Sequence, residues 1–498
     1  MENNVTDKPN DAPIPLDRKS KLWEQLTGDD RFNAEILSTL ATGRAMFIID
    51  WNKWVTWNDK KWSTESLVEI EDICRETTFK LFEKALDIPN DAARKLAMRG
   101  VQHTQCVRGK EGMLAFAKCR SEIARYGRQF DQGKYLFNCW NGTLNLKVGE
   151  CGSHRPDDMI TRTSNVEFFR DTPEEKRTHP LWESFLDDCT GGDDDLKEFL
   201  QRAVGYTLTG DTSEEKLFFV HGPAASGKST FLEAIKGVMG EYAKTADFET
   251  FLKRNNVGGA RNDVATLDGA RMVISVEVDE GKHLAEGLVK QLTGGDTVTA
   301  RFLYRESFEF RPAFKLWLAA NDAPRISDAD AGIWRRILRV PFENTVSQAK
   351  MDPTLKAKFT TDPVLQSAIL SWAVRGCLKW QKGGLQVPAS ITEATAELRY
   401  EMDPLAGFIE DVCCISTSAH VSVTRLRSEY DTWAKNLGYK FTISPQKFNR
   451  RIELKGGKRV LATLSGKRCK AWMGIGLQEY SLVQAEPERT GKNRNTGV

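Results

Sequence analysis

The clearest chemistry in the sequence is a glycine-bounded loop followed by a lysine and a serine. Gly222 and Gly227 enclose four residues, so backbone N–H groups can turn inward on a phosphate without a Cβ in the way. Lys228 would neutralise β- and γ-phosphate oxygens, and Ser229 would hold Mg²⁺. The pattern predicts nucleotide binding and hydrolysis. The residues expected to contact the nucleotide are Gly222, Pro223, Ala224, Ala225, Ser226, Gly227, Lys228, Ser229 and Thr230.

The elements on both sides of this loop are those that a phosphate loop requires. The short apolar run 217–220 is typical of a buried parallel strand. Residues 228–239 keep one helical face apolar, through Phe231, Leu232, Ile235, Val238 and Met239. An inert glycine turn is the alternative, and this strand and helix context disfavours it.

Two further strands are predicted to end in polar groups. The apolar run 271–276 leads directly into acids, and an acid on the strand beside the phosphate loop is needed to hold the Mg²⁺ shell and to polarise water. An acidic turn is the alternative. The run 314–320 ends at Asn321, which either senses the γ-phosphate or begins a loop. The acids are Glu277, Asp279 and Glu280.

Composition excludes several classes of protein. A chain of 498 residues has room for roughly three or four domains. A net charge of +2 gives no global nucleic-acid signature, so any such surface must be local. Ten cysteines at irregular spacing argue against a zinc ribbon or a disulfide framework. A polar N-terminus and the lack of an 18-residue apolar run predict a cytoplasmic protein.

The region before the glycine loop is predicted to be mixed. Residues 1–20 read as a mobile leader and 21–62 as a small tryptophan-rich segment, in which packing is favoured over base stacking. Helical periodicity covers 64–130, and Asn141-Gly142 predicts a hairpin. The expected core positions of the first helix are Leu67, Ile70, Ile73, Cys74, Phe79, Leu81, Phe82 and Leu86.

The C-terminal region supplies a local basic surface. Residues 404–480 are predicted to fold as helix, helix and β-wing, and 481–498 as a disordered tail. A winged-helix module would place the second helix in the major groove and the Gly456-Gly457 turn against the DNA backbone. A solvated charged face is the alternative. The predicted DNA contacts are Lys447, Arg450, Arg451, Lys458 and Arg459.

The glycine loop, the acidic strand end and Asn321, in that order, resemble a superfamily 3 helicase. More narrowly, the chain is similar to the phage and plasmid group related to the poxvirus D5 primase-helicase and the phage P4 replication protein. The resemblance is strong over 135–345 and weak in the flanks. Further similar stretches are 141–146, 154–161, 199–206, 290–296, 300–305 and 334–342.

The resemblance implies an α/β fold with an AAA+-like P-loop NTPase core at 179–345. A D5-like helical and mixed domain at 63–178 would precede the core, and a helical extension at 346–403 and the winged-helix-like domain would follow it. Glu277 resembles the Walker B acid, while Asp279 and Glu280 leave the water-activating carboxylate open. Asn321 resembles sensor 1.

The resemblance also implies residues that act outside their own subunit. Either Arg335 or Arg336 would be the arginine finger, and the other a structural ion-pair partner. The segment 297–309 resembles a DNA-binding hairpin with Tyr304 and Arg305 near its tip, a plain hairpin being the alternative.

We therefore expect an ATP- and Mg²⁺-dependent replicative DNA helicase that forms a homo-hexameric ring on single-stranded and forked DNA. A separate primase is expected, because the first 130 residues lack a paired-carboxylate metal pattern. The alternative is an origin-binding initiator whose ATPase only switches its assembly state.

Overall fold

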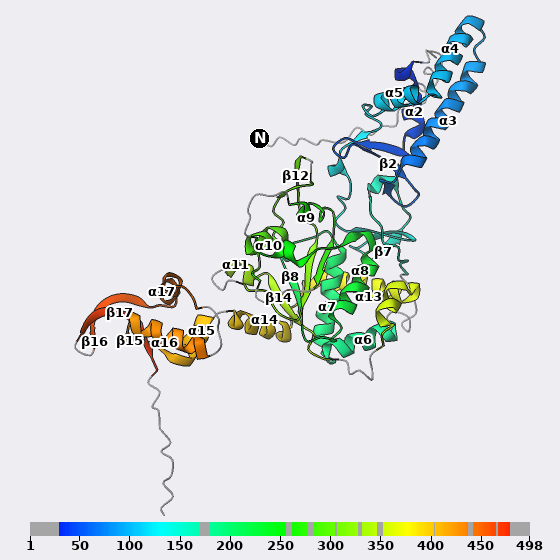
Figure 1. Cartoon of the computed structure of the whole chain (residues 1–498). Helices are drawn as coiled ribbons and strands as arrows, with labels where there is room; N and C mark the ends of the chain where they lie inside the picture. Colours follow the sequence, from blue (N-terminus) through cyan, green and yellow to red (C-terminus); the bar gives the residue numbers. More distant parts are fainter. Residues whose placement is uncertain are drawn as a thin grey trace, which may run out of the picture. The chain divides into compact units, whose positions relative to one another are not determined.

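The computed structural model describes residues 29–169, 179–254, 261–276, 282–303, 306–326, 331–345, 352–402, 404–436, 442–464 and 467–478. The chain forms two compact units, which are considered separately. The larger consists of residues 1–324 and 335–392, and the smaller of 325–334 and 393–498 (Figure 1).

The larger unit is built around a five-stranded parallel sheet with the order β14-β8-β13-β10-β9. Its helices and strands pack into one extensive core, in which Trp317 stacks on Phe218 at 4.3 Å between ring centroids. This confirms the expected α/β class with a parallel sheet. The strands are β8 (Leu217–His221), β9 (Ala243–Thr245), β10 (Met272–Val276), β13 (Lys315–Ala320) and β14 (Ile337–Pro341).

The order of these strands corrects one expectation. The strand beside β8 is β13, which ends before Asn321, and β10 lies one position further away. All six residues of β13 are buried, which fits the central position. The end of β10 is therefore separated from the end of β8, where the glycine loop begins, by a whole strand, and Asn321 follows that intervening strand.

Helices, short strands and turns surround this sheet. The long helices α7 and α13 share the main core with α6 and α8. The elements are η5 (Gly240–Tyr242), η6 (Phe248–Phe251), α6 (Pro180–Thr190), α7 (Asp194–Leu208), α8 (Lys228–Met239), α9 (Asn262–Ala265), α10 (Glu286–Thr293), α12 (Leu355–Thr361), α13 (Pro363–Gly383) and the antiparallel pair β11 (Val298–Arg301) and β12 (Ser307–Phe310).

In the N-terminal part of the larger unit, one sheet contains strands from two segments that were predicted to be separate domains. The sheet β3-β2-β1-β4 takes strands from both 21–62 and 63–178. The elements are α2 (Asp30–Ala41), β1 (Ala45–Ile48), β2 (Lys53–Trp57), β3 (Trp62–Ser63), α3 (Leu67–Leu86), α4 (Asp91–Thr104), α5 (Val107–Ala117), β4 (Ala124–Arg125), η2 (Gly127–Gln129), β5 (Leu136–Cys139), β6 (Gly142–Asn145), β7 (Glu150–Gly152) and η3 (Pro156–Asp158).

Only half of the predicted core face of α3 is buried. Ile70, Ile73, Cys74 and Leu81 are buried, as expected. The other four positions are exposed, because the apolar positions of α3 extend beyond the face that packs on α2 and α4. These exposed residues are Leu67, Phe79, Phe82 and Leu86.

The smaller unit has its own core around Phe408, Tyr430, Phe448 and Trp472. Its antiparallel sheet has the order β15-β17-β16. The elements are α11 (Ala331–Trp334), the last part of α14 (Ala389–Glu401), α15 (Pro404–Val412), β15 (Cys413–Ser422), α16 (Val423–Asn436), α17 (Pro445–Leu454), β16 (Lys458–Leu464) and β17 (Lys467–Leu477).

The predicted wing turn is wrong. Gly456 and Gly457 connect α17 to β16, and the β16–β17 connection falls after Leu464. Gly456 adopts a φ of 97°, which favours glycine at the end of a helix and explains the misleading turn signal. Lys458 and Arg459 therefore lie in strand β16. None of the described helices of either unit has the length and apolar character needed to cross a membrane.

Candidate active site

Two glycines shape the loop between β8 and α8. A Cβ on Gly222 would lie 1.8 Å from the carbonyl oxygen of Phe342 in the segment after β14. Gly227 has a φ of 88°, and a Cβ there would lie 2.4 Å from Cys189 Sγ. The loop can therefore sit against the core only if both positions lack a side chain.

The start of α8 offers donors to an anion. The helix begins at Lys228, and its N-cap, Gly227, has no side chain that could accept a hydrogen bond from the N–H groups of the first turn. The Lys228 ammonium is buried and donates to the carbonyl oxygens of Gly222 at 2.7 Å and Pro223 at 2.6 Å. Burial lowers the pKa of Lys228. Positive charge is thus held inside the loop.

A pocket of about 880 Å³ lies against this loop. It is lined by residues 224–230 and by Asn321 and Asp322, which follow β13. This is the carboxyl edge of the sheet, where ligands bind in open α/β folds. The structure thus brings Asn321 together with the glycine loop. Val276 also lines the pocket, and the predicted acids Glu277, Asp279 and Glu280 lie outside the described residues.

Another part of the pocket wall contains residues that were not predicted from the sequence. They follow β9, a strand of only three residues, and acids after a strand were the signal that could have revealed them. Arg254 Nη2 lies 2.6 Å from Asp263 Oδ2. Burial acts to raise the pKa of Asp263, but hydrogen bonds from Arg261 and both arginine charges lower it overall. The wall comprises Asp247, Phe248, Glu249, Thr250, Leu252, Arg254 and Asp263.

His221, the last residue of β8, was also missed. Burial, together with the nearby charges of Arg339 and Lys228, lowers the pKa of His221 to about 4. The ring is therefore neutral at pH 7, and its Nδ1 lies 3.1 Å from Arg339 Nη2 on the neighbouring strand. A neutral histidine beneath the loop accepts a hydrogen bond without adding charge.

Arg335 and Arg336 do not line this pocket. They precede β14, whose first residue pairs with Leu217 at the start of β8, whereas the glycine loop follows the end of β8. At about 3.3 Å per residue, the strand alone separates the two ends by roughly 13 Å. Both guanidinium groups instead contact Glu215, at 3.0 and 2.9 Å. Their side chains differ in exposure, 64% for Arg335 and 9% for Arg336.

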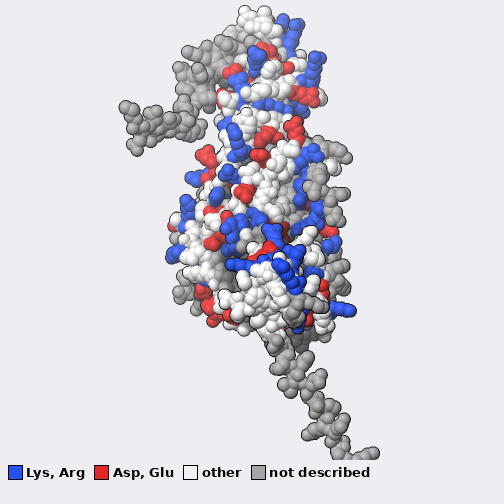
Figure 2. All heavy atoms as spheres, turned by 90° about the vertical axis from the view of Figure 1, so that its left-hand side faces the viewer, with Lys and Arg blue, Asp and Glu red and all other residues white. Residues whose placement is uncertain are grey.

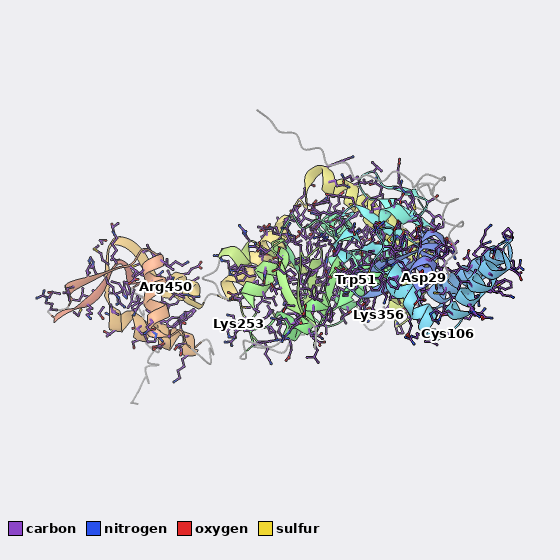
Figure 3. All side chains as sticks on the ribbon, turned by 90° about the horizontal axis from the view of Figure 1, so that it is seen from above. Asp29, Trp51, Cys106, Lys253, Lys356 and Arg450 are labelled. Atoms are coloured by element: carbon purple, nitrogen blue, oxygen red, sulfur yellow. The ribbon has the colours of Figure 1, made fainter. Side chains whose placement is uncertain are left out.

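The candidate DNA-binding residues are spread over both units. In the larger unit, β11 and β12 form the expected hairpin, and Phe302 stacks on Phe308; Tyr304 and Arg305 lie outside the described residues. In the smaller unit, Arg450 and Arg451 lie on α17, and Figure 3 labels Arg450. Lys447 is on the same helix, but its side chain is outside the described set.

The basic residues of β16 are partly engaged within the smaller unit. The Arg459 guanidinium lies 5.0 Å from the ring centroid of Trp472 and 4.0 Å from Glu453. Lys458, on the same strand, is exposed. Figure 2 shows both Lys or Arg and Asp or Glu side chains on the face that it draws. Because the net charge of the chain is only +2, candidates for binding nucleic acid are local surfaces.

Two family models match the chain. Residues 34–191 match the D5 N terminal like family, and residues 220–336 match a family of unknown function, DUF5906. The second match contains the glycine loop, Asn321, Arg335 and Arg336.

The chain is also similar to viral proteins named as putative helicases. One from Acanthamoeba polyphaga mimivirus is 30% identical over 327 residues, covering 62% of this chain and 34% of the relative. One from Frog virus 3 is 24% identical over 364 residues, covering 58% and 37%. The chain thus spans about a third of the length of these relatives.

A solved structure, the apo C terminal region of NrS-1, aligns with 90% of this chain and 99% of its own, at a TM-score of 0.47 and 11% identity. Within the matched regions the chain is thus similar to the D5 N terminal like family, to DUF5906 and to viral proteins named as putative helicases.

Proposed function

We propose that this protein is an ATP-dependent replicative DNA helicase of a phage, plasmid or other mobile element. The observation that carries the proposal is the pocket at the carboxyl edge of the parallel sheet, where the glycine loop, the buried Lys228 ammonium and Asn321 meet. Such an edge suits a nucleoside triphosphate, because backbone N–H groups and a fixed cation neutralise phosphate charge.

The residues of the pocket fit ATP with Mg²⁺. The uncapped first turn of α8 and Lys228 would hold the phosphates, and Ser229, whose side chain is exposed at the pocket, would hold the ion with Glu277. Bound Mg²⁺ supplies positive charge to the phosphate oxygens. One of Glu277, Asp279 and Glu280 would polarise the attacking water, and Asn321 would orient it from the neighbouring strand.

Hydrolysis would be completed by a second subunit. Arg335 lies at the opposite end of β8 from the pocket, so it cannot reach the nucleotide of its own subunit, whereas it is exposed enough to reach another. In a homo-hexameric ring it would stabilise transition-state charge on the γ-phosphate of a neighbour. Arg336, which is almost buried, would support the structure of the same segment.

The partner would be single-stranded or forked DNA in the cytoplasm of the host cell. The β11–β12 hairpin, with Tyr304 and Arg305, would follow the strand through the ring. The smaller unit, with Arg450 and Arg451 on α17, would contact duplex DNA. A separate primase would supply primers.

A second function, an origin-binding initiator, is favoured by the basic side chains of α17 and β16. In that case ATP turnover would only switch the assembly state. The rate of ATP hydrolysis with and without single-stranded DNA separates the two functions. A translocating helicase predicts strong stimulation that Lys228→Ala abolishes, and a slow rate unaffected by DNA would favour the initiator. An unchanged rate in Lys228→Ala would refute both.

A further inference from the structure

A single carboxylate links the loop before β8 to the two arginines before β14. The same oxygen of Glu215, Oε2, lies 3.0 Å from Arg335 Nη2 and 2.9 Å from Arg336 Nη2. The backbone N–H of Leu217 also donates to the carbonyl oxygen of Arg336 at 2.7 Å. The acid is therefore part of the support of the proposed arginine finger.

The loop that carries Glu215 is fixed on both sides. Glu214 Oε1 accepts a hydrogen bond of 2.8 Å from Trp380 Nε1 in α13, and the Lys216 ammonium donates to the carbonyl oxygen of Arg335 at 2.7 Å. Glu215 itself adopts a φ of 52°, an uncommon conformation for a residue other than glycine. Such backbone strain persists only where neighbouring contacts hold it in place.

The two arginines play different parts in this cluster. Arg336 is almost fully buried, so its ion pair fixes the position of the carboxylate. Arg335 is mostly exposed, and the bond from Nη2 to Glu215 is the only hydrogen bond that its guanidinium group makes within the described residues. The other N–H groups of its planar fork remain available to a second anion.

We infer that Glu215 is a positioning residue for the arginine finger: it holds one end of the Arg335 guanidinium so that the other end faces the phosphate of a neighbouring subunit. The inference rests on the proposed function, because it requires Arg335 to act on another subunit's ATP. It predicts that the loss of the Glu215 charge lowers kcat by about 10- to 100-fold and leaves KM for ATP nearly unchanged, because an anchored cation acts mainly in the transition state.

Assemblies made from two different variant subunits can show in which subunit the loss of the Glu215 charge lowers ATPase activity. Lys228→Ala subunits keep the finger but lack a working nucleotide site, and Arg335→Ala subunits have the reverse defect. A mixture of the two should regain ATPase activity at interfaces where each supplies what the other lacks. Glu215→Gln, which keeps the side-chain size, is then added to one subunit type at a time.

We expect Glu215→Gln to reduce the regained activity about 10-fold or more when it is in the Lys228→Ala subunit, which donates the finger. In the Arg335→Ala subunit it should have little effect, because that subunit has no finger to position. The inference would be overturned if Glu215→Gln lowered the regained ATPase activity equally in both mixtures, lowered it only when placed in the Arg335→Ala subunit, or lowered it in neither.

Glu198→Gln is a matched control. Glu198 also pairs with a buried arginine, Arg202 at 3.0 Å, and a more exposed cation, Lys379 at 3.5 Å, and it does not line the pocket. This variant should keep the wild-type kcat. The mixture of Lys228→Ala and Arg335→Ala subunits, without Glu215→Gln, tests the proposed function separately. If each variant assembles but this mixture regains no activity, then Arg335 does not act on the ATP of a neighbouring subunit. That result differs from a failure of the Glu215 inference, in which the mixture regains activity and Glu215→Gln does not reduce it as expected.

Discussion

His221, the residue before the glycine loop, is kept neutral by burial and by nearby positive charges. Its imidazole lies within hydrogen-bond distance of Arg339, and the charge of Lys228 also acts on it, so protonation would add a third positive charge to a partly buried site. The low pKa of His221, about 4, follows from burial first and from these charges second. A neutral ring is thus part of the resting structure at physiological pH.

This pKa predicts how stability depends on pH. Between pH 6.5 and 4 the unfolded chain binds a proton at His221 that the folded chain does not, so the free energy of unfolding of the wild type falls as pH is lowered. His221→Asn should remove about 1–2 kcal/mol of that fall, after allowance for partial solvent screening. Thermal unfolding of the wild type and of His221→Asn at pH 7 and pH 4.5 measures this difference. An equal fall in the free energy of unfolding of both proteins would contradict the low pKa of His221.

Arg335 and Arg336 should respond differently to substitution. Arg335→Ala removes an exposed ion pair and should change the free energy of unfolding by less than about 1 kcal/mol, yet lower the ATPase rate of the assembled protein by about 10³-fold. Arg336→Ala breaks a nearly buried pair and should cost about 3 kcal/mol. Denaturant unfolding measures the two losses of stability, and ATPase assays measure the two losses of rate.

Comparable losses of stability in the two variants would contradict the different roles of Arg335 and Arg336, which the sequence alone left open.

At the scale of elements, the loop between β8 and α8 depends on glycine. Gly227→Ala should destabilise the protein by about 2–3 kcal/mol and raise KM for ATP at least about 10-fold, since the new Cβ would meet Cys189 Sγ at 2.4 Å in a left-handed conformation. Gly287→Ala is the control: it lies in α10 with nothing within 4 Å of its Cβ, and should stabilise by up to about 1 kcal/mol. Similar melting temperatures for the two variants would refute the steric argument.

The sequence predicted single elements better than their arrangement. The strands β8, β10 and β13 were found because each is a continuous apolar run, whereas β9 has only three residues and gives no such signal. The neighbour of β8 was assigned wrongly because strand order depends on contacts between distant segments, which periodicity does not encode. The pocket wall after β9 was missed because this short strand gives no continuous apolar run to mark where the wall begins.

The exposed side of α3 shows a second limit of sequence patterns. Phe79, Phe82 and Leu86 are apolar at helical spacing, and pattern alone assigned them to the core. Which part of an apolar face is covered depends on the neighbouring helices, here α2 and α4. Patterns therefore located the helix and overestimated its buried face.

At the scale of the whole molecule, the smaller unit should contribute charge contacts to DNA. Arg450→Ala, at an exposed position of α17, should weaken duplex binding at every sequence and reduce the slope of log Kobs against log salt by about one. Arg75→Ala on α3, which removes an exposed arginine paired with Asp72, is the control and should leave the slope unchanged. Equal slopes for the wild type and Arg450→Ala would exclude a phosphate contact at this position.

ATP-driven helicase activity is best tested by measuring the unwinding of a forked DNA duplex by the purified protein with ATP and Mg²⁺, with Lys228→Ala as the paired control. We expect unwinding by the wild type alone, because Lys228 is the cation held inside the phosphate loop. No unwinding by a wild-type protein that hydrolyses ATP and binds the fork, or equal unwinding by both proteins, would show that the protein is not an ATP-driven helicase.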